Sequence, residues 1–409
     1  MNKIRNTNLT IQIITMTILG VVIGASFGQY LGFLDVLGKV FLRLIQMSIV
    51  VLIMGQIIEA VGNLNPKGLG KIGLKTFGLF LFSSLIAAVI GVTAGTVFNP
   101  GSGVNTSSMD VSGEAFETTS AGTIPELVLD FFPTNIFNAM AEGIIVQVIV
   151  FALIFGIALS FVRIEQKENS ILEWIKQINA IILKMIALIM KLAPIGIFSI
   201  IVSTISKMGL SVILPMGKYL FVYGFATAMY LLIWFIVTSI YLKVSIIQLT
   251  RNMIEMSLVA LTTTSSAITL PTALHDSKEK LGISDRIAKL VLPLGMSLNS
   301  NGSSMHMAIT IVTIAQIYGV TYQMSDFVYI VILSTMASLA NAVVPGAGLV
   351  SLSIVIPSMG LPIESIALFA GIDWFVGMLR TVLNVDSDTT TALIIAKSEN
   401  ELDYDIFNR

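Results

Sequence analysis

Four polar residues in the last long apolar segment have the types and spacing to bind an anion and a cation together. Seven, four and four positions separate Asp373, Arg380, Asn384 and Asp388, so they share one helical face. Arginine offers a planar fork that matches a carboxylate, and no Lys or Arg lies between Lys289 and Arg380. Oxygens of Asn384 and Asp388 are hard ligands that suit an alkali cation. The alternative is an internal Arg–Asp pair that only holds helices together.

A second polar cluster is the sequence NSNGSS at residues 299–304. Gly302 and the short polar side chains around it favour local unwinding of a helix, which frees backbone carbonyls to bind a cation. The alternative is that these small and hydroxyl residues only pack helices together, as they do widely in membranes.

Two further segments interrupt apolar runs with residues that disfavour a regular helix. TTTSSAITLPT (262–272) is rich in hydroxyl side chains, and VPGAG (344–348) combines a proline without an N–H group and two glycines. Such breaks leave backbone amides and carbonyls available for binding or gating. Either sequence alone is also typical of an ordinary turn.

The elements that position these residues must lie in a membrane. Of the 409 residues, 55% are hydrophobic and 11% are charged, and mean hydropathy is +0.90. Soluble domains contain about 25% charged residues. A net charge of −1 gives no reason to expect nucleic acid, and the absence of cysteine excludes disulfides and thiolate metal sites. The two histidines, His275 and His306, lie too far apart in sequence to resemble a metal cluster.

Intramembrane enzymes and ion channels are the competing classes of function. Asp373 and Asp388 lie fifteen residues apart on one helix, about 22 Å by helical rise, which is too far for a catalytic dyad. A channel could line its pore with the polar breaks, but it would not need the lone Arg380. We therefore expect a transporter with no enzymatic activity and no cofactor other than coupling ions.

Apolar segments long enough to span a membrane recur along the chain. The first begins after a basic N-terminus and is longer than the core of a signal peptide, so we interpret it as a membrane helix. The segment at 125–162 is long for one span and is predicted to be broken. The predicted spans are 9–29, 40–62, 74–98, 125–162, 179–205, 215–242 and 362–397.

Basic residues set the orientation of these spans. The loop 101–123 contains no Lys or Arg, so it is predicted outside, and both termini are predicted in the cytoplasm. The charged segment 275–289 is also predicted in the cytoplasm, which makes the preceding apolar run a hairpin with its tip at 262–272. A second hairpin, 327–357, should open outside. Two such breaks indicate a binding site near the membrane midplane; two kinked structural helices are the alternative.

Four motifs in order resemble the dicarboxylate/amino acid:cation symporter family, the glutamate transporter homologues. They are the serine-rich tip with TLP, the NSNGS strip at 299–303, the PGAG tip, and the final D…RT…NV…D helix. The resemblance covers nearly the whole chain, and the sequence FNPG (98–101) fits it as well. It implies an all-α polytopic membrane protein with eight transmembrane helices and two re-entrant helical hairpins, working as a homotrimer of independent elevators.

The same resemblance implies a division into a scaffold and a moving transport domain. The scaffold would comprise 1–72 and 124–210, and the transport domain 73–100 and 211–399. Residues 101–123 would form an extracellular loop and 400–409 a cytoplasmic tail.

Carried over position by position, the resemblance also implies the site residues. Substrate contacts would be Thr264, Ser266, Ser303, Val344, Gly348, Arg380, Thr381 and Asn384, with Gly377 beside them. One sodium site would use Gly295, Asn299, Asn384 and Asp388. A second would use Ser297, Ser300, Ser338, Leu339 and Asn341. A third would use Ser83, Ser84, Asn299 and Asn301.

Two positions depart from the family pattern. Asn301 replaces the aspartate of the NMDGT strip and Ser300 replaces its methionine, which weakens the expected third sodium site. Gly377 stands where amino-acid-transporting members carry the aspartate that holds the α-amino group of the substrate.

The expected function is a secondary symporter of the cell membrane. It would couple inward movement of sodium, or of protons, to uptake of a small anionic solute, either a dicarboxylate or an acidic amino acid. A transporter of a neutral or bulkier amino acid in the same family is the alternative. The expected partners are the substrate, sodium, the lipid bilayer and two further copies of the chain.

Overall fold

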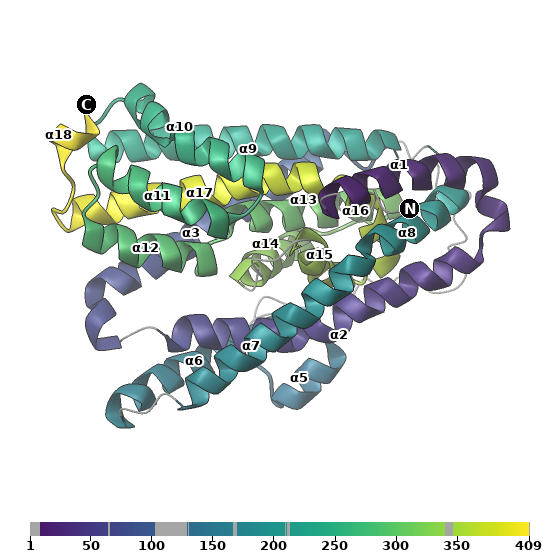
Figure 1. Ribbon diagram of the computed structural model, residues 1–409, viewed down its shortest axis with the longest axis horizontal. Coiled ribbons are helices and arrows are strands. Elements are labelled where there is room, and N and C mark those ends of the chain that lie inside the picture. The colour runs from purple at the N-terminus through teal and green to yellow at the C-terminus, as the bar shows by residue number, and fades with distance from the viewer. Residues whose placement is uncertain are drawn as a thin grey trace, which may run out of the picture.

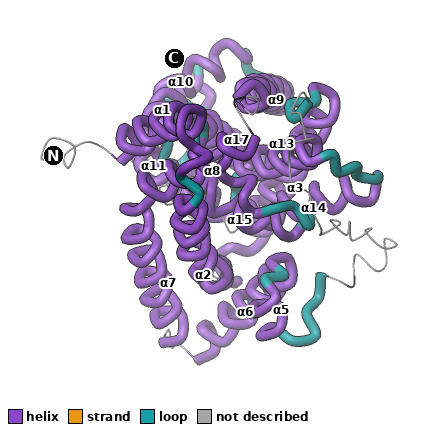
Figure 2. Tube along the Cα trace, turned by 90° about the vertical axis from the view of Figure 1, so that its right-hand side faces the viewer, coloured by secondary structure: helices purple, strands orange, loops and turns teal. Residues whose placement is uncertain are grey.

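Long apolar runs punctuated by glycine, proline and capping residues fold here into helices. The computed structural model describes residues 9–63, 66–102, 129, 131–166, 170–208, 210, 213–339 and 347–408. Within these ranges every named element is a helix, and the one β-bridge is an isolated pair, Ile283 with Leu402 (Figures 1 and 2). The all-α prediction is confirmed.

One group of helices comes from the first half of the chain. The helix α2 contacts α6, α7 and α8, and α1 packs along α8 (Figure 1). The short helix α5 packs on α6. The bounds are α1 Leu9–Phe27, α2 Phe33–Gly62, α5 Ile136–Glu142, α6 Ile145–Gln166, α7 Ser170–Ile189 and α8 Ala193–Met208, with 3-10 turns η2 Gly28–Tyr30 and η4 Met190–Leu192.

A second group surrounds α13, in which 16 of 18 residues are buried. The helices α3, α9, α14, α15 and α17 all contact it, and α10, α11 and α12 pack on α17 (Figure 1). The bounds are α3 Pro66–Phe98, α9 Ile213–Leu242, α10 Ile246–Thr263, α11 Ser266–Glu279, α12 Asp285–Leu298, α13 Asn301–Tyr318, α14 Met324–Leu339, α15 Ala347–Ser358, η6 Ile363–Ser365, α16 Ile366–Ala370, α17 Asp373–Ser398 and α18 Tyr404–Phe407.

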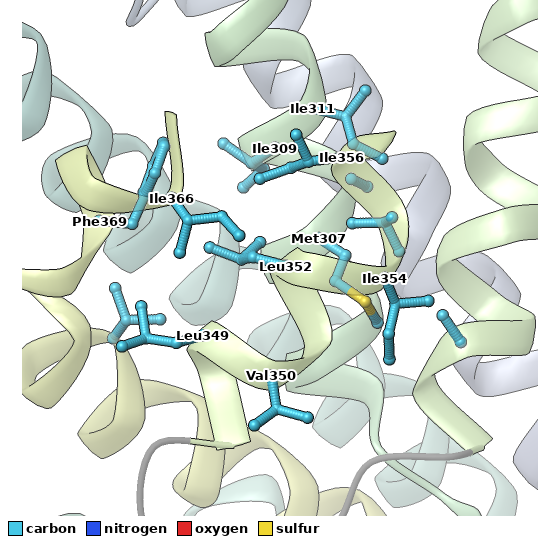
Figure 3. Close-up of a cluster of buried hydrophobic side chains, with 14 of the residues drawn as sticks. Met307, Ile309, Ile311, Leu349, Val350, Leu352, Ile354, Ile356, Ile366 and Phe369 are labelled. Atoms are coloured by element: carbon cyan, nitrogen blue, oxygen red, sulfur yellow. The ribbon is translucent and has the colours of Figure 1, made fainter. Parts of the chain in front are cut away.

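Apolar packing fixes α13 against α15 and α16. Side chains from α15, such as Leu352 and Ile356, meet Met307 and Ile309 of α13, and Phe369 of α16 closes one side (Figure 3). On the opposite side, small residues bring α3 close to α13. A Cβ added at Gly91 would lie 2.8 Å from the Met305 carbonyl oxygen, so any larger residue would push the two helices apart.

Three described helical segments are long and apolar enough to cross a membrane alone: Ile72–Phe98, Ile145–Glu165 and Leu214–Leu242. Two bent pairs, Ser170–Ile189 with Ala193–Ser206 and Ile363–Ala370 with Asp373–Ser398, raise this number to five if each pair is one span. The chain is thus a multi-pass membrane protein by length and composition. The expectation of eight transmembrane helices remains a prediction.

Three of the predicted spans are broken, and in one of them, 362–397, the helices on either side of residues 371–372 meet at 85°. The segment 125–162 is interrupted after α5 at Gly143, which adopts the left-handed conformation (φ 68°), so the predicted break there is confirmed. The segment 179–205 was predicted as one span, but α7 and α8 meet at an angle of 57°. Pro194, near the start of α8, lacks the N–H that would continue the hydrogen-bond ladder.

The breaks around the candidate site are narrower than predicted. The helix α10 reaches Thr263, only Thr264 (φ 51°) and Ser265 lie outside a helix, and α11 begins at Ser266. The predicted tip 262–272 was therefore too wide, because the Ser265 side chain caps α11 at once by accepting from the Ile268 N–H. Likewise, only Asn299 and Ser300 separate α12 from α13. Most of the second predicted tip, 340–346, lies outside the described residues.

The last residues fold back onto the molecule rather than extending as a tail. We call residues 399–408 the C-terminal clasp. The Phe407 side chain is fully buried, and its carbonyl accepts a hydrogen bond from the Asn252 amide of α10 at 2.9 Å. The Asp403 N–H donates to the carbonyl of Gly282 (φ 68°), where a Cβ would lie 2.1 Å from the Asp403 carbonyl oxygen. Only glycine allows this approach.

Candidate functional site

Arg380 lies in the first third of α17 and is nearly buried, at 8% exposure. Its Nη1 atom is buried and has no hydrogen-bond partner among the described residues. A Cβ added at Gly302 would lie 2.5 Å from the Arg380 carbonyl, so the start of α13 packs directly on the arginine backbone. The guanidinium interacts electrostatically with Asp373, but its unsatisfied buried N–H group is costly, and binding of an anion would reduce that cost.

Gly377 lies one turn before Arg380 and faces the tip of the first hairpin. Among the described residues, the atoms nearest to a Cβ added there would be Arg380 Nη2 and Thr264 Cβ, both at 3.8 Å, which is ordinary contact. Thr264 is the left-handed residue at the tip between α10 and α11. The hairpin tip, Gly377 and the guanidinium therefore meet at one position, which we call the position beside Gly377.

The opposite wall comes from Gly348 at the start of α15. A Cβ added at Gly348 would lie 2.6 Å from Arg380 Nη1 and 2.0 Å from Asp373 Oδ1. A side chain here would collide with both groups, so the glycine allows the start of α15 to pack directly against Asp373 and the guanidinium. Val344 lies outside the described residues.

The remaining predicted substrate contacts lie near Arg380 but are engaged with protein. The Thr381 hydroxyl donates to the Gly377 carbonyl at 2.8 Å, and Asn384 Oδ1 accepts from the Gly302 N–H at 2.8 Å. Ser303 is buried in the first turn of α13, and Ser266 is half-buried at the start of α11. Asn384 thus fixes the α12–α13 break against α17.

The first predicted cation site is assembled around Asp388. Asn299 Nδ2 donates to Asp388 Oδ1 at 2.7 Å, and both side chains are buried. A Cβ added at Gly295 would lie 2.5 Å from the same oxygen, so the backbone of α12 lies against the carboxylate. Asn384 lies one turn earlier on α17. Three of the four predicted ligands are therefore in direct contact.

The third predicted site is also assembled, but without a carboxylate. The hydroxyls of Ser83 and Ser84 donate to Asn301 Oδ1 at 3.3 and 2.6 Å, and to Asn299 Oδ1 at 3.3 and 3.2 Å. Asn301 Nδ2 donates to the Tyr230 hydroxyl at 3.0 Å. Asn301 thus presents an N–H donor at the place where an aspartate would present a second oxygen to a cation.

The second predicted site is described only in part. Ser297 and Ser338 each bond a carbonyl of their own helix, those of Pro293 and Thr335, and Ser297 is exposed. Ser300 lies in the break before α13, and Leu339 ends α14. The helices α12 and α14 touch. Asn341 lies outside the described residues.

Sequence analysis missed the tyrosines of α9. Tyr219, Tyr223 and Tyr230 are buried, and the last two direct their hydroxyls at the site: Tyr223 donates to the Gly302 carbonyl at 2.9 Å, and Tyr230 donates to the Ser83 carbonyl at 3.2 Å. Their spacing of four and seven positions places them on one helical face. This stripe of polar-tipped aromatics in an otherwise apolar helix was the available signal.

Comparison with known proteins gives a consistent answer. Residues 9–398 match the sequence profile of the Sodium:dicarboxylate symporter family. The chain is 30% identical over 400 residues to the "Proton/sodium-glutamate symport protein" of Bacillus subtilis (strain 168), covering 96% of this chain and 92% of the relative.

Two further relatives carry different substrate names. The "Proton/glutamate-aspartate symporter" of Escherichia coli (strain K12) is 30% identical over 413 residues, 97% of this chain and 94% of the relative. The "C4-dicarboxylate transport protein" of Bacillus subtilis (strain 168) is 30% identical over 405 residues, with the same two coverages. On the profile match across almost its full length, the chain belongs to the sodium:dicarboxylate symporter family.

Proposed function

We propose that this chain is a secondary active symporter that takes up a small dicarboxylate or acidic amino acid together with sodium, protons or both. One observation carries the proposal: the buried Arg380 guanidinium, whose Nη1 has no hydrogen-bond partner among the described residues, lies next to Gly377 and the hairpin tip at Thr264. A fixed cation at membrane depth is costly and is retained where an anion binds it. Relatives named for glutamate, aspartate and C4-dicarboxylates support this class of substrate. The family is one of transporters, not enzymes, so the expected absence of enzymatic activity is confirmed.

Among acidic solutes, the geometry favours a dicarboxylate without an amino group. An ammonium group needs a carboxylate or several carbonyls near the substrate carbon, and Gly377 offers no side chain. Without a side chain at Gly377, a second carboxylate or a bulkier acid would instead be preferred at this position. Carbonyl groups and the Thr381 hydroxyl leave amino acids as weaker ligands.

Cation coupling in the proposal centres on Asp388. The carboxylate, the Asn299 amide and the Gly295 backbone form a compact oxygen-bearing set. We expect a sodium ion here, a further sodium ion at the backbone oxygens of the α12 and α14 ends, and weak or no binding at Asn301. The stoichiometry should then be below three sodium ions per substrate.

The proposed mechanism is an elevator. The grouping of helices supports it, because α1, α2, α6, α7 and α8 pack among themselves while α3 packs with α9, α12, α13, α14 and α17. The first group would be the scaffold of a homotrimer in the cell membrane, with both termini in the cytoplasm. The second, with α10–α11 and α14–α15 as the two hairpins, would carry the substrate.

A ligand screen tests the proposal. The purified protein is heated with succinate, malate, aspartate or glutamate, with sodium or with choline as the control cation, because ligands of the native state raise the melting temperature. Succinate or malate should raise the melting temperature most, and only with the coupling cation present. Hits are then tested for uptake into proteoliposomes with an imposed sodium or proton gradient. The proposal fails if no acidic solute binds, or if flux does not saturate.

A further inference from the structure

Tyr219, His306 and Thr310 form a buried polar cluster between α9 and α13 to which the transport scheme above gives no role. The Tyr219 hydroxyl is hydrogen-bonded to His306 Nδ1 and, at 3.0 Å, to the Thr310 hydroxyl. His306 is 1% exposed, and the other two side chains are fully buried. The rings of Tyr219 and Tyr223 also pack on the imidazole, with centroids 6.0 and 5.8 Å away. The imidazole is therefore held in one position inside the protein.

The second ring nitrogen of His306 is free. Nε2 is buried and has no hydrogen-bond partner. The Tyr219 hydroxyl also lies 3.4 Å from the His306 carbonyl, so it can donate to that carbonyl while its oxygen accepts from Nδ1–H. In this arrangement Nε2 keeps its lone pair and can take up a proton. A histidine buried at membrane depth with one basic nitrogen unused is a candidate for proton transfer.

The charged groups around the ring belong to the substrate site. Arg380 of α17 interacts electrostatically with His306, and both Arg380 and Asp373 interact with Tyr219 and Tyr223 of α9. Among the described residues of α3, α14 and α15, which also pack on α13, no charged group interacts with the imidazole. Burial removes the imidazole from water, and Arg380 is the described charged group that acts on it, so an anion bound to Arg380 would act on it as well.

We propose that His306 is the proton-binding residue of this transporter, taking up one proton at Nε2 when an anionic substrate binds to Arg380. The inference rests on the proposed symport function and assigns the proton to a residue outside the substrate and sodium sites. In the absence of substrate, the positive charge of Arg380 opposes a second positive charge on the nearby ring. A dicarboxylate on Arg380 replaces that repulsion with attraction.

The coupling that follows is reciprocal. A bound substrate favours a protonated His306, and a protonated His306 favours a bound substrate by the same factor. After release of the substrate inside the cell, the proton leaves Nε2 and the empty carrier returns with a neutral imidazole. One proton and one substrate cross the membrane in each cycle, and no other bond is made or broken.

Two histidine variants separate this role from a structural one. The chain contains two histidines, and the other, His275, has a side chain that is 67% exposed. His306→Gln keeps a polar side chain that can bond Tyr219 but cannot hold a proton, and His275→Gln is the matched control. Both are reconstituted in proteoliposomes that contain a pH-sensitive dye, with the membrane potential clamped at zero. Succinate is added outside with sodium present, and proton entry and labelled succinate entry are recorded together.

The expected result is loss of substrate-driven proton entry in His306→Gln, with sodium-dependent succinate entry retained. The wild type and His275→Gln should both acidify the lumen. Between about pH 8 and pH 5.5, a range that spans ordinary histidine titration, the apparent KM for succinate should fall in the wild type and stay constant in His306→Gln. Proton entry that persists in His306→Gln overturns the inference, and so does a wild type that takes up succinate without protons. If the wild type takes up succinate without protons, the proposed symport function still stands. A wild type that takes up no dicarboxylate or acidic amino acid contradicts the proposed function itself.

A second variant guards against misfolding of His306→Gln. Tyr219→Phe removes the hydroxyl at Nδ1 but retains the imidazole, so proton entry should persist while the pH midpoint of succinate uptake shifts. An unchanged midpoint in Tyr219→Phe counts against the inference. The pH dependence of succinate uptake would then not depend on the hydrogen bond between Tyr219 and the His306 ring.

Discussion

Two polar regions of this molecule share the helices α12 and α17, yet their hydrogen bonding differs. In the C-terminal clasp, Glu401 accepts from the Ser284 hydroxyl and pairs with Arg286 at 2.9 Å, and the Asn252 amide donates to the carbonyls of Lys280 and Phe407 at 2.8 and 2.9 Å. Around Arg380, in contrast, Nη1 has no hydrogen-bond partner among the described residues, and Gly377 offers no side chain.

This difference in hydrogen bonding distinguishes polar groups that stabilise the fold from polar groups that are available to bind a ligand. Polar groups with protein partners contribute to stability, whereas a buried unpaired charge reduces it by several kcal/mol. Such a charge persists where its ligand compensates for it, which ties reduced stability to function. Substitutions around Arg380 should therefore reduce ligand binding more than stability. Substitutions in the C-terminal clasp should reduce stability more than ligand binding.

The largest expected effect is that of Arg380→Ala on binding. Removing the guanidinium takes away the only fixed cation at the described site, so binding of succinate or malate should be abolished. The melting temperature without ligand should change less than ligand binding does, because loss of the unsatisfied guanidinium N–H is offset by loss of its interaction with Asp373. Thermal shift with and without succinate measures both. Arg286→Ala, at the clasp, is the control and should keep full ligand stabilisation; unchanged succinate affinity in Arg380→Ala would contradict the assignment.

Asn301→Asp should strengthen cation binding by an amount of the order of kcal/mol. The variant adds a full negative charge where solvent screening is poor, and the hydroxyls of Ser83, Ser84 and Tyr230 are already placed to bond it. Sodium should then stabilise the protein at lower concentration, and the reversal potential in proteoliposomes should shift towards one more sodium ion per substrate. Asp388→Asn is the opposite control and should weaken sodium dependence. A wild type that already moves three sodium ions would refute the expectation.

Gly377→Asp should change substrate preference rather than abolish transport. Among the described residues a Cβ at this position has no neighbour closer than 3.8 Å, so the backbone tolerates a side chain whose carboxylate can bond an ammonium group. Such a charge-assisted bond contributes about 1.5–3 kcal/mol, or roughly 10- to 150-fold in affinity. Competition between succinate and aspartate for uptake measures the change, with Gly377→Ala as a control for size alone. If the wild type already binds aspartate far more tightly than every amine-free analogue, another group holds the amine.

The sequence was informative where spacing alone decides neighbours. Asp373, Arg380 and Asp388 share a helical face by periodicity, and the breaks at 264–265 and 299–300 follow from residues that disfavour helix continuation. Widths of breaks were overestimated because caps such as Ser265 restart a helix at once. Partners on other helices could not be derived: Tyr230 on Asn301 and His306 on Tyr219 depend on how α9 packs on α13.

The C-terminal clasp illustrates the same limit. A short polar segment after the last helix has the composition of a free tail, and only tertiary contacts bury Phe407. Whether such a segment folds depends on a cavity formed by residues more than a hundred positions earlier, among them Asn252 and Ser284. Local pattern contains no information about that cavity.

The smallest expected effect is that of Glu401→Gln, which tests the clasp side of the comparison. The partner Arg286 is 67% exposed, so water screens the ion pair and its loss should cost no more than about 1 kcal/mol of stability. The backbone bond from the Ser284 N–H to the Glu401 carbonyl is unaffected at 3.1 Å, and Gln can still accept from the Ser284 hydroxyl. Succinate affinity should not change, because the substitution leaves the groups around Arg380 in place.

Phe407→Ala is the stronger variant of the same region. It removes a fully buried side chain and should cost about 3–5 kcal/mol of stability by cavity formation. The melting temperature should fall while the folded fraction still binds succinate. A loss of succinate affinity in Glu401→Gln as large as that in Arg380→Ala would show that the two regions are not separable, and that the clasp sets the position of the hairpin tip at Thr264.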